Sequence, residues 1–237
     1  MPEEKKEVSA KKTPNQFFFG LVSGIAVIGV IGMAVFGVMY FKGKNNGQVA
    51  GEQNAANNEQ NNQAEQKVEM QITAADWFIG NKDAKVKIFS FSDFQCPYCA
   101  RFHNYLHDLV KAYPNDVVWV FRNFPIQSHP MGLPGALAAE CAGAQGKFFE
   151  MADKIFAGQS GLGEEKFNTF ATELGLNLTE FKACVAEQKP KDKISADYEL
   201  GVQSGIQGTP TSFINGEKVE GAVPLESLKK LVDGLLK

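Results

Sequence analysis

The pattern that most limits the fold of this chain is strand, helix, strand, with a Cys-Pro-Tyr-Cys motif where the helix begins. The segments "KVKIFSF" (85–91) and "DVVWVFRNF" (116–124) are rich in β-branched and aromatic residues, as is typical of buried strands. Between them the apolar residues recur at helical spacing on one face: Phe102, Tyr105, Leu106, Leu109 and Val110. The pattern predicts a βαβ unit, in which a right-handed crossover joins two parallel strands.

The chain after this unit predicts a block of helices followed by a β-hairpin. The expected helices cover residues 136–145, 148–156, 165–174, 178–187 and 192–204. Strands at 211–214 and 218–220 flank Asn215-Gly216, a dipeptide that suits a tight type I′ turn. A last amphipathic helix carries Leu225, Leu228, Val232 and Leu235. The domain is therefore expected to be of the α/β class.

A second strong feature lies near the N-terminus, where Phe17–Phe41 contains 25 residues and no charge. As a helix it would span about 37 Å, enough to cross a hydrocarbon core of about 30 Å. A cleaved signal peptide has a shorter apolar region, and a buried core helix would be followed by globular sequence, so both alternatives are disfavoured. Four lysines precede the span and two follow it closely, which predicts a cytoplasmic tail (1–16) and an extracytoplasmic domain.

Residues 42–68 are dominated by Asn and Gln and contain almost nothing that could enter a core. Such a composition predicts a flexible linker between the anchor (17–41) and the folded domain, which begins at residue 69. The formal net charge of −3 gives no indication of nucleic-acid binding. The sequence thus predicts a single-pass protein of a bacterial cell membrane, with its domain on the side where disulfides persist.

The motif Cys96-Pro97-Tyr98-Cys99 follows the first strand directly. Cys96 is expected at the helix N-terminus, where unpaired N–H groups and the helix dipole stabilise a thiolate. Pro97 suits a first helical position, and Cys99 turns towards the apolar face. An exposed attacking thiol next to a shielded resolving thiol is what thiol–disulfide exchange requires.

The same residues allow two other interpretations of this segment, a zinc site and a purely structural disulfide. Cys96, Cys99, His103 and His107 superficially match a zinc ligand set. However, Cys99 and His107 are about 12 Å apart along one helix, so one ion cannot reach all four ligands. A three-ligand site without His107 is conceivable, although the histidines are expected to flank the buried face. A purely structural disulfide is disfavoured, because closing a two-residue loop stabilises little.

Three segments together resemble the DsbA-like thiol–disulfide oxidoreductases of the thioredoxin superfamily. They are "FSDFQCPYC" (91–99), "FRNFPI" (121–126) and "GIQGTPTSFINGE" (205–217), and the resemblance extends over residues 70–237. It implies a thioredoxin fold (69–127 and 190–237) with an inserted helical domain (128–189). It also implies that Cys96 attacks and Cys99 resolves, and that Pro210 is a cis-proline that leaves the Thr209 backbone free to pair with an extended client.

The sequence departs from this family pattern at two places. Tyr98 stands where strongly oxidising members carry histidine, and Ser90 stands where an acidic residue often precedes the motif. The Pro97-Tyr98 dipeptide occurs in oxidants, isomerases and reductants alike, so it does not predict the direction of electron flow.

The remaining cysteines, Cys141 and Cys184, fall on two of the helices expected in the inserted block. Buried free thiols are one interpretation, but outside the membrane a structural disulfide is favoured, and DsbA-like relatives carry a second bridge there.

The function expected is a disulfide-donating oxidase for exported proteins, reoxidised by a quinone-linked membrane partner. An isomerase or reductase with the same site, and a non-catalytic peptide-binding chaperone, are the alternatives. No cofactor motif and no metal site are expected.

Overall fold

The computed structural model describes residues 69–237. The predicted cytoplasmic tail, membrane anchor (17–41) and linker (42–68) lie outside the described residues and stay predictions. Within residues 69–237, every helix is too short or too polar to span a bilayer.

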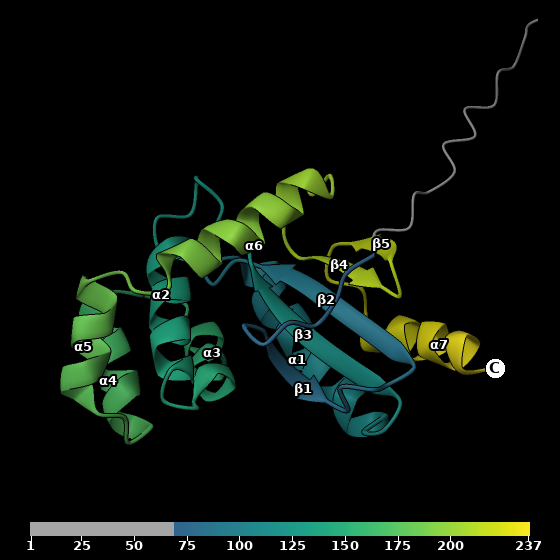
Figure 1. Cartoon of the computed structure of the whole chain (residues 1–237), viewed down its shortest axis with the longest axis horizontal. Coiled ribbons are helices and arrows are strands. Elements are labelled where there is room, and N and C mark those ends of the chain that lie inside the picture. Colours follow the sequence, from purple (N-terminus) through teal and green to yellow (C-terminus); the bar gives the residue numbers. More distant parts are fainter. Residues whose placement is uncertain (1–68) are drawn as a thin grey trace, which may run out of the picture. The chain divides into compact units, whose positions relative to one another are not determined.

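The described domain is built on a five-stranded sheet in the order β1-β3-β2-β4-β5 (Figure 1). Its strands are β1 (Trp77–Gly80), β2 (Val86–Ser92), β3 (Val117–Asn123), β4 (Thr211–Ile214) and β5 (Glu217–Glu220). Strands β2 and β3 are parallel and joined through helix α1 (Pro97–Ala112), which confirms the predicted βαβ unit. The other neighbouring strands pair antiparallel. Since β2 and β3 are the inner strands and are covered on both faces, nearly all their residues are buried.

Strand β1 was not predicted from the sequence. It is four residues long and pairs with the free edge of β3, so that Phe78 is opposite Val120. Its side chains alternate between partly buried and exposed, and Phe78 lies on the solvent side. A strand of this length offers too few alternations to be recognised from periodicity.

The helices follow the predicted order, with ends shifted by a few residues. They are α2 (Gly132–Gly143), α3 (Phe148–Ala157), α4 (Glu164–Glu173), α5 (Leu178–Ala186), α6 (Lys191–Gln203) and α7 (Leu225–Leu236). Helix α2 begins four residues earlier than predicted and packs against the loop before α1. A Cβ at Gly135 would lie 2.7 Å from Cβ of Phe94, so glycine allows this close approach.

Two hydrophobic cores cover the two faces of the sheet. The larger contains the apolar faces of α1 and α7 together with side chains of α2 and α3. The smaller lies beneath α6 and contains aromatic residues such as Phe91, Phe124 and Phe213. Because α2 and α3 share the larger core with the sheet, the helices at 128–189 do not have a core of their own. The domain boundaries at 128 and 189 therefore remain a proposal.

A buried ion network connects β3 to α6 and to the segment before β1. The Arg122 guanidinium lies 2.9 Å from carboxylate oxygens of both Asp76 and Asp197, and both carboxylates are almost fully buried. Lys193 adds contacts of 2.8 Å to Asp197 and 3.0 Å to Glu140 of α2. Each buried charge thus has an opposite charge beside it, which burial requires.

Candidate functional site

The loop between β2 and α1 holds Cys96 at the point where the helix begins. Cys96 is the N-cap residue and Pro97 the first residue of the helix. The carboxylate of Asp93 fixes the loop, because its Oδ1 accepts hydrogen bonds from the N–H groups of Gln95 (2.7 Å) and Cys96 (3.0 Å). In the first turn of the helix that follows, the backbone N–H groups of Tyr98 and Cys99 hydrogen-bond to the Cys96 sulfur.

Both thiols are buried, with Cys96 4% and Cys99 0% exposed, so the expectation of an exposed attacking thiol is wrong. The two thiols nevertheless differ strongly in their hydrogen bonds and in the pKa that these produce. Hydrogen bonding from the Cys99 thiol, and from the backbone N–H groups of Cys99 and Tyr98, outweighs burial and lowers the pKa of Cys96 to about 5. Burial, reinforced by the neighbouring Cys96, raises the pKa of Cys99 well above its ordinary value. At neutral pH Cys96 is a thiolate and Cys99 a protonated thiol, which gives Cys96 the role of nucleophile.

The segment before β4 is brought to the motif from 113 residues away. The Thr209–Pro210 peptide bond is cis, and the carbonyl oxygen of Thr209 lies 3.4 Å from Sγ of Cys96. In its protonated form the Cys96 thiol donates to this oxygen. The Thr209 hydroxyl also lowers the pKa of Cys96. The structure thus gathers Cys96, Cys99 and Thr209-Pro210 into one site.

Of the other residues singled out in the sequence, Tyr98 lies beside the motif, Ser90 lies within the sheet, and Cys141 and Cys184 lie outside the site. Tyr98 is more than half exposed beside the motif, and the Arg101 guanidinium lies 5.7 Å from its ring centroid. Ser90 is fully buried in β2 and accepts a hydrogen bond from the Trp119 indole (2.7 Å). Cys141 and Cys184 form a disulfide with Cα atoms 5.8 Å apart, joining α2 to α5 and not taking part in the site.

The four residues that superficially matched a zinc set do not converge. His103 and His107 turn their Nε2 atoms to Asp153 of α3, whereas the two cysteines face Thr209 and Asp93.

Sequence reasoning missed two residues that hold the motif in place. Oδ2 of Asp93 accepts from the backbone N–H of Ile126 (2.7 Å), and its Oδ1 lies 3.0 Å from the imidazole of His129. Gln159 donates to the carbonyl oxygens of Phe94 (3.0 Å) and Cys96 (2.9 Å). The spacing of Asp93 to Gln95 and Cys96 is that of an Asx turn and could have been recognised. Gln159 comes from the helical block and has no local signal.

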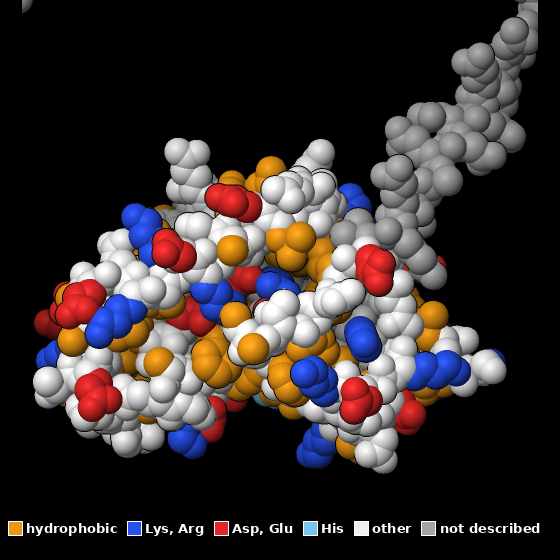
Figure 2. Space-filling view, in the orientation of Figure 1, with side chains coloured by type: hydrophobic (Ala, Val, Ile, Leu, Met, Phe, Trp, Pro, Cys, Tyr) orange, Lys and Arg blue, Asp and Glu red, His pale blue; other side chains and the backbone are white. Residues whose placement is uncertain are grey.

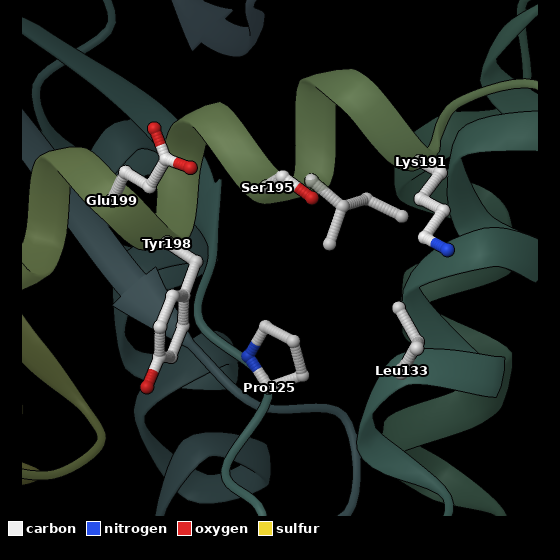
Figure 3. A pocket seen from close by; sticks show the side chains of 7 residues that line it. Pro125, Leu133, Lys191, Ser195, Tyr198 and Glu199 are labelled. Carbon is white, nitrogen blue, oxygen red and sulfur yellow. The ribbon is translucent and has the colours of Figure 1, made fainter.

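A cavity of about 270 Å³ opens between α6, the start of α2 and the segment that follows β3. Figure 3 shows the side chains that line it: Pro125, Leu133, Lys191, Ile194, Ser195, Tyr198 and Glu199. The Tyr198 ring stacks on Phe124, with centroids 4.7 Å apart. Hydrophobic and charged side chains are interspersed over the face drawn in Figure 2. The residues of the cysteine site do not line this cavity.

Residues 72–234 match the protein family described as Thioredoxin, over more than half of the chain. The chain belongs to the thioredoxin family. Among solved structures, a thioredoxin-like oxidoreductase from Silicibacter pomeroyi superposes with a TM-score of 0.60 at 26% identity, covering 68% of this chain and 92% of that one. The catalytic domain of Proteus mirabilis ScsC gives 0.61 at 26% identity, with 69% and 90% covered.

Two further relatives define the limits of the similarity. The thiol–disulfide exchange protein alpha-DsbA2 of Wolbachia pipientis has a TM-score of 0.63 at 22% identity, covering 68% of this chain and 88% of that one, which shows the fold alone. A curated relative, the Na(+)/H(+) antiporter NhaA 1 of Salinispora arenicola, is 33% identical over 154 residues, 65% of this chain and 24% of that protein. This chain thus spans about a quarter of the length of the curated relatives it matches. The thioredoxin family match and the similarity to a thioredoxin-like oxidoreductase thus agree with the thiol–disulfide exchange that the paired cysteines of the site could perform.

Proposed function

We propose that this chain is a disulfide-donating oxidase for exported proteins. The observation that carries the proposal is the stabilised thiolate of Cys96, whose pKa is lowered to about 5. Stabilising the thiolate stabilises the reduced form of the pair, so the Cys96–Cys99 disulfide becomes a stronger oxidant. A reductase would need the opposite balance.

The reaction has two exchange steps. A client thiolate attacks Sγ of Cys96 in the Cys96–Cys99 disulfide, and Cys99 leaves and is protonated, as its raised pKa favours. A second client thiolate then attacks the client sulfur of the mixed disulfide, and Cys96 leaves as a thiolate. The client loses two electrons and two protons; the pair gains the electrons, one proton goes to Cys99 and the other to solvent.

The cis Thr209–Pro210 segment supports the binding of an extended client. Proline has no N–H, and the backbone of Thr209 faces the Cys96 sulfur. An extended chain in mixed disulfide with Cys96 would lie along this backbone and pair with it, as in strand-addition complexes. The exposed Tyr98 ring would be a second contact.

The sequence of the N-terminal segment extends the proposal to localisation. The uncharged run Phe17–Phe41, with its preceding lysines, supports a single-pass anchor in a bacterial cell membrane with the domain outside the cytoplasm. We propose that a quinone-linked protein in the same membrane reoxidises the pair.

The proposal is tested by mixing the oxidised full chain with an unfolded, fully reduced client protein and counting the client disulfides formed. The wild type should form them stoichiometrically, and Cys96→Ser and Cys99→Ser should form none, because neither variant can carry the Cys96–Cys99 disulfide. Mixed instead with a client that already contains a disulfide, Cys99→Ser should accumulate a mixed disulfide, as its Cys96 thiolate attacks the client disulfide and releases a client thiolate. Activity only on wrongly paired client disulfides would indicate an isomerase. Client reduction at the expense of an added thiol would indicate a reductase. A Cys96→Ser variant that still assists client folding would indicate a chaperone.

A further inference from the structure

A cluster of three metal-ligating side chains lies where helix α1 contacts α3, away from the thiols. Nε2 of His103 lies 2.6 Å from Oδ1 of Asp153, and Nε2 of His107 lies 2.9 Å from the same oxygen. The two Nε2 atoms are 3.2 Å apart. Three potential ligand atoms thus surround one point, with the two histidines separated by one turn of α1.

No placement of the imidazole hydrogens gives every ring nitrogen of this cluster a hydrogen-bond partner. If both Nε2 atoms are protonated and donate to Asp153, neither can accept from the other across their 3.2 Å contact. The opposite nitrogen of His103, Nδ1, is then a buried acceptor, and it has no partner in the described part of the chain. If Nδ1 of His103 is protonated instead, the lone pair on Nε2 faces the Asp153 carboxylate. A cation between the three atoms would accept the lone pairs of both Nε2 atoms and of the Asp153 carboxylate, and would leave only Nδ1–H of His103 without a partner.

The surroundings hold the two imidazoles rigidly while leaving one side open. Both rings pack edge-on against Trp119, with centroids 5.1 Å away, and the His103 ring also contacts Phe156. The His103 side chain is 2% exposed, His107 33% and Asp153 49%. The cluster therefore has an apolar wall on one side and access to solvent on the other, as a metal site with an open position requires.

We propose that His103, His107 and Asp153 bind a divalent first-row transition metal, with zinc as the ion that fits best. Two imidazoles and one carboxylate are a ligand set of zinc sites that keep a position for water, whereas Mg²⁺ and Ca²⁺ prefer oxygen ligands. Tetrahedral ligands of zinc lie about 3.3 Å from one another. The three atoms are 2.6–3.2 Å apart, so each pair needs to separate by less than 1 Å.

The bound ion would clamp α1 to α3 one helical turn beyond the resolving thiol Cys99.

The test measures zinc binding by the full chain, purified with the Cys96–Cys99 disulfide formed so that the thiols cannot bind the ion. Titration against a chromophoric zinc indicator should give one site. Asp153→Asn and His107→Gln should each weaken it by at least about 10- to 100-fold, the cost of losing even an outer-shell partner. Asp108→Asn, which removes an exposed carboxylate from the same helix, should leave the affinity unchanged.

A second measurement reports the ligands directly. Co²⁺ bound to the oxidised chain should show visible d–d bands without a thiolate charge-transfer band, and the bands should disappear in Asp153→Asn. A Cys96→Ser, Cys99→Ser variant should bind zinc as the oxidised wild type does. The proposal is overturned if the oxidised chain binds no zinc stoichiometrically. It is equally overturned if Asp108→Asn weakens binding as much as Asp153→Asn, or if binding requires the free thiols.

Discussion

The Thr209 hydroxyl offers a way to change the oxidant strength of the site without touching either cysteine. Thr209 Oγ1 is buried, and within residues 69–237 it has no fixed hydrogen-bond partner. It is therefore free to donate to the Cys96 thiolate and helps to lower its pKa. Replacing Thr209 with valine removes this donor and nearly preserves the shape of the side chain.

The expected effect follows from the energy of one hydrogen bond to a charged group, about 1.5–3 kcal/mol. This corresponds to about 1–2 pKa units, so Thr209→Val should raise the pKa of Cys96 from about 5 to about 6–7. At pH 7 ionisation favours the reduced wild-type pair by a factor of about 100, which falls to about 10 at a pKa of 6 and about 2 at a pKa of 7. The reduction potential should fall by about 30–50 mV.

The assay is the pH dependence of thiolate absorbance and of iodoacetamide alkylation at Cys96, combined with redox equilibration in glutathione buffers. Ser212→Ala is the matched control, because its hydroxyl is also buried in the same segment but does not contribute to the pKa of Cys96. An unchanged Cys96 pKa in Thr209→Val would refute the assignment of the hydroxyl as a donor to the thiolate. An equal shift in Ser212→Ala would do the same.

Three further outcomes are expected. The pKa of Cys96 is about 5 in the folded chain against an ordinary value of 9.0, so ionisation of Cys96 should stabilise the reduced chain relative to the oxidised one by a further ~1.4 kcal/mol per pH unit from pH 5 to pH 9, and should contribute nothing below pH 5. Urea unfolding of both forms across this range measures the difference in stability, and a difference that does not change with pH would contradict the prediction. Limited alkylation of the native reduced chain at neutral pH should modify Cys96 and spare Cys99, whose pKa is raised, as peptide mass mapping would reveal; equal labelling would exclude the separate roles. Arg122→Leu leaves the buried Asp76 carboxylate without its cation and Asp197 with Lys193 alone, and should lower the free energy of unfolding by about 3–5 kcal/mol. Urea unfolding measures this loss, and a loss under about 1 kcal/mol would show that the Arg122 ion pairs do not stabilise the fold.

The sequence predicted those parts of the fold that rest on local pattern. The β2–α1–β3 unit, the β4–β5 hairpin at Asn215-Gly216 and the order of the helices all have periodicity or turn signals of their own. Strand β1 has none, since it is a strand only because β3 offers it an unpaired edge. The early start of α2 likewise depends on its packing against Phe94, which local pattern does not contain.

The residues of the site likewise fall into those that local sequence predicts and those that only the tertiary fold brings together. Cys96 and Cys99 were recognisable because the helix N-terminus and the thiol spacing are encoded within a few residues. The position of Thr209 beside them follows from strand pairing across more than a hundred residues and came only from the family resemblance. The partner that turns His103 and His107 into a cluster is Asp153, on another helix, so no spacing rule along α1 could have found it.

The reduction potential of the Cys96–Cys99 pair tests the central claim most directly. The full chain is equilibrated in glutathione buffers of known composition, its thiols are trapped, and the fraction reduced is read by mass. A stabilised Cys96 thiolate predicts a potential well above that of the glutathione pool, near those of protein oxidants at about −120 mV. A potential in the range of thioredoxin, about −270 mV, would contradict the account and identify a reductant.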